Sequence, residues 1–173
     1  MNNSIVLTVI ADDKPGVINT VSSVLERHGG SWNQSSMSSL AGQFAGILLA
    51  SVPDDRSEMC LKELRGLESK GLRVIAHLSR EASGSGETTG EYVLELVGND
   101  RPGIVHDISS ILANYNVNVK NLETLVESAS MSGDDLFRAR AILIVPMSTD
   151  IDALERELEA MANDLMVDIS FEK

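Results

Sequence analysis

The chain has 173 residues, of which 43% are hydrophobic, 23% charged and only 3% aromatic, and its formal net charge is −12. This length excludes a large multidomain enzyme, and the composition excludes a disordered chain and predicts a globular protein with an aliphatic core. The negative charge makes DNA and anionic membranes poor candidate partners, because affinity for polyanions rests largely on Lys and Arg.

The expected compartment is the cytoplasm. The single cysteine, Cys60, cannot form an intramolecular disulfide. The residues that follow Met1 lack the basic start and the long hydrophobic core of a signal peptide. No apolar run approaches the roughly 18 to 20 residues that a membrane-spanning helix needs.

An internal repeat organises the chain. Residues 5–18 recur as residues 92–105, and the same shift of 87 positions carries residues 21–25 onto residues 108–112 without a gap. The residues between the copies are rich in Gly, Ser and Thr, a composition that cannot bury enough apolar surface to order itself. We expect three segments: an N-terminal domain over 1–80, a flexible linker over 81–90 and a C-terminal domain over 91–173.

Charge differs between the two copies. Residues 1–80 carry 8 basic and 8 acidic side chains, whereas residues 91–173 carry 6 basic and 16 acidic ones. This acidity is either a solvated surface that aids solubility or a docking face for a basic partner.

The first copy alternates strand patterns with helix patterns. Pro15 precedes apolar residues at helical spacing, and the glycines after His28 favour a helix end there. Ala41-Gly42 separates two strand patterns and suggests a hairpin. The expected elements are a strand over 5–11, a helix from Pro15 to about His28, strands over 31–39 and 43–52, a helix over 56–70 and a strand over 72–79.

The second copy repeats this order with clearer signals. Pro102 precedes the first helix, residues 131–134 form the expected hairpin turn, and Thr149 or Asp150 can cap the last helix. The expected elements are a strand over 91–98, a helix from Pro102, strands over 117–128 and 136–146, a helix over 150–164 and a strand over 166–171.

The order βαββαβ predicts the α+β fold class, with two tandem ferredoxin-like domains. Each domain is expected to be an antiparallel four-stranded sheet with two helices on one face. A unit of about 80 residues buries only some 60 to 65% of its unfolded surface. We therefore expect the copies to pack on one another, either within one chain or between two chains of a homodimer.

The junction between first strand and first helix is the most specific motif, and it occurs twice. It is Asp12-Asp13-Lys14-Pro15-Gly16 in the first copy and Asn99-Asp100-Arg101-Pro102-Gly103 in the second. Proline suits the first helical position, and glycine leaves room for a small ligand. The unpaired N–H groups of a helix start can bind a carboxylate.

The same junctions contain acceptors for an ammonium group. The carboxylate of Asp12, Asp13 or Asp100 can accept hydrogen bonds from the ammonium group of a bound amino acid. The amide of Asn99 can accept from that ammonium group or donate to the ligand's carboxylate. The alternative is that Asp, Pro and Gly form an ordinary turn and helix cap with no ligand.

The paired Asp-Lys-Pro-Gly-Val and Asp-Arg-Pro-Gly-Ile turns, each after an apolar strand in a βαββαβ unit, resemble the ACT domain, a regulatory module that senses amino acids. The resemblance covers nearly the whole chain apart from the linker. It implies that a small amino acid, with glycine as first candidate, binds at a domain interface. Two such modules without a catalytic domain resemble a transcriptional repressor that acts through a DNA-binding activator protein and not by contacting DNA.

The resemblance also implies particular ligand contacts. In the second copy they are Asp100, Arg101 and Gly103 at the turn and Asn118 at the start of the second strand. In the first copy Asp12, Asp13 and Gly16 match the turn, but Ser31 stands where the second copy has Asn118, which puts an equivalent second pocket in doubt. Replacing Gly103 with valine is expected to abolish ligand binding and leave the fold largely intact.

No residues suggest catalysis, a metal or a cofactor. His28, His77 and His106 fall in three different elements, Cys60 lies within an apolar helix stripe, and no nucleotide-binding glycine motif occurs. The expectation is a non-enzymatic regulator. The competing hypothesis is a ligand-free ACT-like module that mediates assembly or protein interaction.

Overall fold

The computed structural model describes residues 1–79, 88–128 and 135–173. The chain divides into two compact units, Met1–Gly84 and Ser85–Lys173, each with its own sheet and core. Most of the expected linker, residues 81–87, lies outside the described part. Thr89 and Gly90 belong to a strand and not to a linker, because they pair with Pro146 and Val145.

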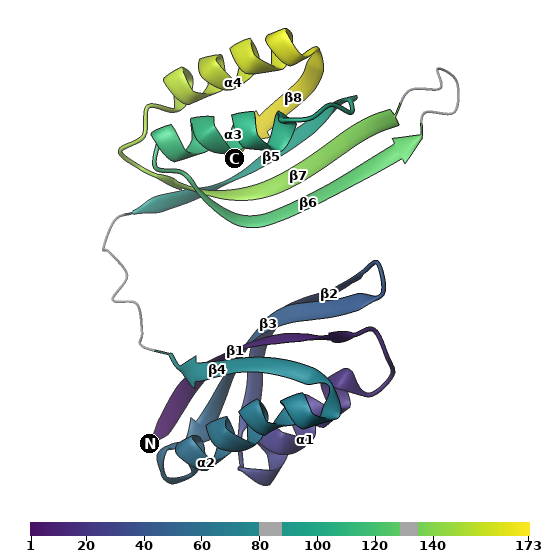
Figure 1. Cartoon of the computed structure of the whole chain (residues 1–173). Coiled ribbons are helices and arrows are strands. Elements are labelled where there is room, and N and C mark those ends of the chain that lie inside the picture. Colours follow the sequence, from purple (N-terminus) through teal and green to yellow (C-terminus); the bar gives the residue numbers. More distant parts are fainter. Residues whose placement is uncertain (80–87, 129–134) are drawn as a thin grey trace. The chain divides into compact units, whose positions relative to one another are not determined.

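The N-terminal unit is a four-stranded antiparallel sheet whose helices cover one face (Figure 1). The strand order is β2-β3-β1-β4, so β1 and β2 run in the same direction on either side of β3. Its elements are β1 (Asn2–Asp12), α1 (Val17–Arg27), β2 (Ser31–Leu40), β3 (Gln43–Pro53), α2 (Asp54–Arg65), the 3-10 helix η1 (Gly66–Lys70) and β4 (Leu72–Leu78).

The C-terminal unit repeats this architecture with strand order β6-β7-β5-β8. Its elements are β5 (Thr89–Asn99), α3 (Ile104–Asn114), β6 (Asn118–Ser128), β7 (Asp135–Pro146), α4 (Ile151–Leu165) and β8 (Val167–Glu172). The expected α+β, ferredoxin-like fold is thus confirmed in both units. The hairpin turn expected at residues 131–134 lies outside the described residues.

Each core forms where the sheet meets its helices. Alternate residues of β1 (Ile5, Leu7, Val9 and Ala11) are buried toward α1 and α2, as strand periodicity requires. Cys60 on α2 belongs to this core and is fully buried, and desolvation, with a smaller effect of Glu63, raises the pKa of its thiol to about 11. Within the described residues no helix is both long and apolar enough to cross a membrane.

The first helix of each unit starts later than the sequence analysis predicts. The prediction placed Pro15 and Pro102 at the first helical position, but α1 begins at Val17 and α3 at Ile104. Gly16 and Gly103 precede these helices with φ of 100°. The left-handed glycine turns the chain from strand to helix, and the proline lies before this turn, outside the helix.

Two other helices differ in detail. The segment predicted as one helix over 56–70 is an α-helix to Arg65 and a 3-10 helix beyond it, and Gly71 with φ of 82° ends it. The predicted cap of α4 is confirmed for Asp150, whose Oδ1 accepts a hydrogen bond of 3.0 Å from the backbone N–H of Ala153.

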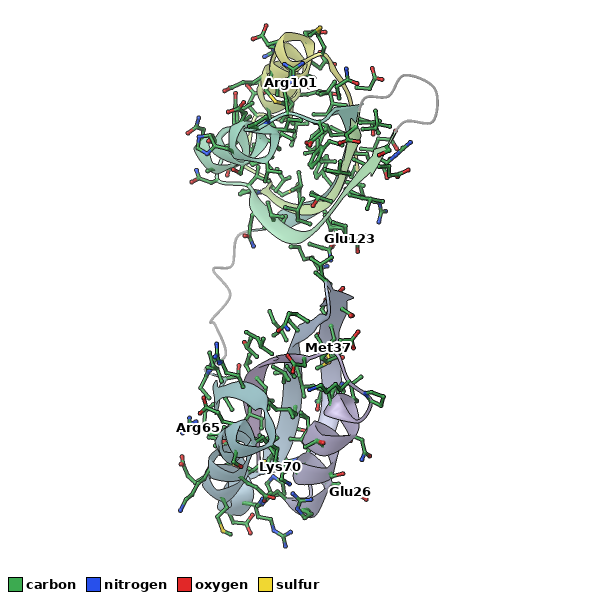
Figure 2. All side chains as sticks on the ribbon, turned by 45° about the vertical axis from the view of Figure 1, so that its right-hand side comes forward. Glu26, Met37, Arg65, Lys70, Arg101 and Glu123 are labelled. Carbon is green, nitrogen blue, oxygen red and sulfur yellow. The ribbon has the colours of Figure 1, made fainter. Side chains whose placement is uncertain are left out.

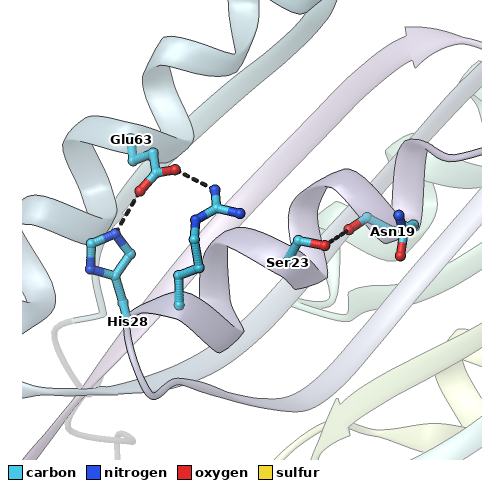
Figure 3. A network of polar contacts seen from close by, with 5 residues as sticks. Asn19, Ser23, His28 and Glu63 are labelled. Carbon is cyan, nitrogen blue, oxygen red and sulfur yellow. Dashed lines mark hydrogen bonds and ion pairs between the residues drawn. The ribbon is translucent and has the colours of Figure 1, made fainter.

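An ion-pair network connects the end of α1 to α2 (Figure 3). The guanidinium of Arg27 and the His28 ring both contact the carboxylate of Glu63, with 2.7 Å from His28 Nε2 to Glu63 Oε2. A separate hydrogen bond lies within α1, where Ser23 Oγ donates to the backbone carbonyl of Asn19 at 2.7 Å. The hydrogen bond from Arg27, followed by that from His28, lowers the pKa of Glu63.

Glu63→Gln is expected to destabilise the N-terminal unit by about 0.2 to 1 kcal/mol at neutral pH, the range measured for exposed ion pairs. Because the folded-state pKa of Glu63 is depressed, its contribution is present above the ordinary value of 4.5 and is lost as the pH falls through the lowered folded value. Denaturant unfolding followed by the fluorescence of Trp32, the single tryptophan of the sequence and a residue of the N-terminal unit, should show a difference between wild type and variant at neutral pH and none at acid pH. The control is Glu68→Gln, an exposed glutamate with no ion pair among the described residues, and an equal loss in that variant would contradict the prediction.

Candidate functional site

The N-terminal turn is held from two sides. The backbone N–H of Asp13 donates to the Gly42 carbonyl at 2.9 Å, which ties the turn to the β2–β3 hairpin. At the helix side, the Gly16 carbonyl accepts hydrogen bonds from Thr20 N at 2.9 Å and from Thr20 Oγ1 at 2.8 Å. The turn after β1 therefore has a defined conformation that positions its charged side chains.

Both aspartates of this turn have partners. Lys14 Nζ lies 3.0 Å from Asp12 Oδ2, and Gln43 Nε2 donates to Asp12 Oδ1 at 3.2 Å. Both hydrogen bonds lower the pKa of Asp12, and the one from Lys14 has the larger effect. The carboxylate of Asp12 is therefore ionised at neutral pH. Asp13 Oδ2 accepts a hydrogen bond of 2.5 Å from Ser39 Oγ.

A hollow of about 250 Å³ opens beside the turn. It is smaller than a pocket for a drug-sized molecule and suits a ligand of few heavy atoms. Lys70, at the end of η1, adds a second cation to that of Lys14, and the described residues provide it with no ion pair (Figure 2). The lining residues are Ala11, Asp12, Lys14, Pro15, Gly16, Val17, Thr20, Lys70, Gly71 and Leu72.

The described residues provide no side-chain cap for the helix start in this hollow. Among them no side chain accepts from the first N–H groups of α1 or of α3, whereas α4 has its Asp150 cap. The first turn of α1 also contains no acidic residue. Its N–H groups and the helix dipole can therefore attract an anion.

The C-terminal turn differs in charge. Asn99 ends β5, and the N–H of Asp100 donates to the Asp135 carbonyl at 2.8 Å. Asp107, in the first turn of α3, occupies the repeat position of Thr20, and its Oδ2 lies 3.8 Å from where a Cβ of Gly103 would be. This carboxylate opposes a second anion at the start of α3, although Arg101 on the turn is a cation (Figure 2).

Asn118 lies far from the turn of its own unit. It pairs with Ile144, which in turn pairs with Glu91, and Glu91 is eight positions before Asn99 on β5. The separation along the sheet is therefore about 26 Å. The structure brings Asn99, Asp100, Arg101 and Gly103 together on one turn but leaves Asn118 at the opposite end, as it does Ser31 in the N-terminal unit.

The expected effect of Gly103→Val requires correction. Gly103 has φ of 100°, a conformation that β-branched residues rarely adopt. Valine would strain the turn itself, so loss of binding in that variant would not separate a ligand site from a damaged fold.

Three residues near the N-terminal turn were not predicted: Ser39, Gln43 and Lys70. The predicted ferredoxin-like fold contains a signal for the first two. Because β1 and β2 run in the same direction, the end of β2 and the hairpin that follows it lie beside the end of β1. Lys70 has a similar signal, since β4 starts next to the end of β1.

The remaining candidate residues do not assemble a site. His106 is exposed on α3, and Cys60 is buried in the core. Across residues 1–79, 88–128 and 135–173, no group of three or more His, Cys, Asp or Glu side chains is arranged to hold a metal ion.

The chain is thus a tandem of two ferredoxin-like domains, each with a left-handed glycine before its first helix. Residues 3–77 and residues 92–163 each match the ACT domain family, and the chain belongs to that family. The UPF0237 protein MK1213 of Methanopyrus kandleri is 35% identical over 79 residues, which are 44% of this chain and 80% of that protein.

Two solved structures resemble the chain over almost its full length. An unknown protein from Galdieria sulphuraria is 26% identical with a TM-score of 0.87, over 99% of this chain and 98% of that one. A "putative glycine cleavage system transcriptional repressor" is 16% identical with a TM-score of 0.68, over 99% of this chain and 97% of that one. At this identity the second likeness shows a shared fold.

Proposed function

We propose that the hollow beside the N-terminal turn binds a small amino acid, with glycine as the first candidate. The observation that carries this proposal is the combination of a carboxylate, two lysines and an uncapped helix start around about 250 Å³. A zwitterion needs both an anion and a cation as partners, and this hollow offers both.

The charges suggest an orientation for the ligand. Its carboxylate would lie between Lys70 and the N–H groups of α1, and its ammonium group would contact Asp12 in place of Lys14. Asp12 is suited to this exchange because its lowered pKa keeps it ionised. In the C-terminal unit Asp100, Arg101 and Asn99 remain candidates, with Asp107 as the unfavourable neighbour.

At the level of the whole chain, we propose a non-enzymatic repressor of glycine cleavage genes. It would act by binding a DNA-binding activator protein and not by contacting DNA. The net charge of −12 supports an indirect action, because a polyanion would be repelled. Linkage supplies the mechanism: the ligand changes partner affinity only as far as it binds one conformation more tightly than another.

A ligand-free interaction module is the second candidate, and one observation favours it. Asp12 and Asp13 already have hydrogen-bond partners within the protein, so the turn is satisfied without a ligand.

The two candidates are separated by measuring thermal stability of the full chain with each of the twenty amino acids. A specific ligand at about 100 times its Kd stabilises by about 2.7 kcal/mol. Lys70→Gln is expected to weaken that binding by about tenfold or more, because a charge-assisted contact is lost.

The matched control is Lys62→Gln, an exposed lysine on α2 that does not line the hollow. If all twenty amino acids leave stability unchanged, the ligand-free module is correct. If the two lysine variants lose affinity equally, the ligand binds elsewhere.

A further inference from the structure

The two sheets have the same fold but different outer faces, meaning the faces opposite the helices (Figure 1). Strand alternation and the pairing register identify the residues of the N-terminal outer face. They are Gln34, Ser36 and Ser38 on β2, Ala45, Ile47 and Leu49 on β3, Val6, Thr8 and Ile10 on β1, and Arg73, Ile75 and His77 on β4. These three rows contain no carboxylate, and Asp12, which alternation also places on this side of the sheet, lies one row further along, at the end of β1.

The C-terminal unit provides an internal comparison. The central row of the N-terminal outer face is Ser36–Ile47–Thr8–Ile75, and the corresponding row of the C-terminal sheet is Glu123–Arg140–Glu95–Ser170. There Arg140 Nε donates to Glu95 Oε1 at 3.1 Å. The C-terminal row thus consists of polar and charged side chains that solvent can hydrate. The N-terminal row instead contains two isoleucines, Ile47 and Ile75, whose exposed fractions are 57% and 58%.

The apolar residues form a continuous and uneven surface. A shallow depression of about 340 Å³ lies on this face, with Thr8, Ile10, Ser36 and Ile47 among its lining residues. Scattered exposed apolar side chains are normal, but a contiguous apolar patch marks an interaction surface. Large and small side chains alternate along the central row. The isoleucines project from the patch, and the gaps over Ser36 and Thr8 can receive projecting side chains of a partner surface.

Charge identifies the occupant as a second copy of this chain. Residues 1–80 are balanced, with 8 basic and 8 acidic side chains, while residues 91–173 carry 6 and 16. Two copies therefore repel one another least through their N-terminal units. A basic partner would bind preferentially to the acidic unit, and an acidic partner would find only Arg73 and His77 at the β4 edge of this face.

The area is adequate for such a contact. The four strands have 11, 10, 11 and 7 residues, which at about 3.3 Å per residue and about 4.8 Å between strands give a face of about 600 Å², with the three rows named above at its centre. A standard protein interface buries about 800 Å² per partner. We propose that this outer face is the interface of a homodimer, in which two N-terminal sheets pack face to face about a twofold axis. The proposal is independent of the amino-acid site, which lies at the end of β1.

The test transfers the C-terminal ion pair to the N-terminal face. Thr8→Glu together with Ile47→Arg recreates the pair Glu95–Arg140 on an equivalent backbone, so the double variant is expected to fold. Analytical ultracentrifugation from about 1 to about 100 μM should show a wild-type dimer and at least about 100-fold weaker self-association in the double variant.

Leu125→Glu is the matched control, because Leu125 is also 57% exposed but lies on the outer face of the C-terminal sheet near Glu123 (Figure 2). It should dimerise as wild type does. A wild-type monomer over the whole concentration range, or a double variant that dimerises like wild type, would overturn the proposal. The double variant should retain any amino-acid binding, so a failure here is distinguishable from a failure of the proposed ligand site.

Discussion

Gly46→Ala is expected to destabilise the N-terminal unit by about 2 to 3 kcal/mol, as overpacking of a close contact does. Gly46 on β3 faces Met37 on β2, and Met37 packs against the core (Figure 2). A Cβ on Gly46 would collide with Met37 Cγ, and it would lie 2.6 Å from the Ser36 carbonyl oxygen and 2.8 Å from Met37 Cα. The side chain of Met37 can move, but the backbone of β2 can do so only by separating from β3.

The C-terminal unit shows how the same contact accommodates an alanine. There Ala139 occupies the position of Gly46, and the smaller Thr124 occupies that of Met37. Adding Met37→Thr to Gly46→Ala should therefore recover part of the lost stability. Gly66→Ala is the control, since Gly66 has helical φ and its Cβ would meet nothing within 4 Å.

Hydrogen exchange of β2, and denaturant unfolding followed by the fluorescence of Trp32 in the N-terminal unit, measure both effects. The expected result is faster exchange in β2 for Gly46→Ala and unchanged or slightly higher stability for Gly66→Ala. Wild-type stability in Gly46→Ala would mean that the strands tolerate the added methyl group.

Leu154→Ala is expected to destabilise the C-terminal unit by about 3 kcal/mol. Leu154 on α4 is fully buried in the core beneath the sheet, and truncation there loses the transfer free energy of the side chain and leaves a cavity. Met147→Ala is the control in the same unit, because Met147 is largely exposed and should change stability by less than about 0.5 kcal/mol.

The readout for Leu154→Ala has to resolve the two units. The chain has two separate cores, so a single two-state free energy of unfolding is not defined for it. Hydrogen exchange followed peptide by peptide gives a value for each unit. Equal losses in Leu154→Ala and Met147→Ala would contradict the burial of Leu154.

The fold was predictable from the sequence because the same local patterns occur twice in it. Apolar runs marked β1 and β5, helical spacing marked α1 and α3, and the internal repeat allowed each copy to support the interpretation of the other. The errors occur at helix ends. The proline rule placed Pro15 inside α1, whereas the left-handed conformation of Gly16, which no periodicity records, sets the actual start.

The site was less predictable, because its composition depends on contacts across the sheet. The turn residues Asp12 and Gly16 were found since they are adjacent in sequence. Lys70 comes from a segment 54 positions beyond Gly16 and enters the hollow only through the pairing of β1 with β4. The position of Asn118 depends on the same topology, and analysis of the motif alone could not show that it lies at the far end of the strand.

The buried thiol of Cys60 can be used to measure transient opening of the N-terminal core. An electrophilic labelling reagent cannot reach the buried sulfur of Cys60 in the closed state. The raised pKa of about 11 also leaves almost no thiolate, the nucleophilic form, to react with the reagent. Because the sequence contains no other cysteine, the labelling rate at moderate pH measures how often the N-terminal core is transiently exposed.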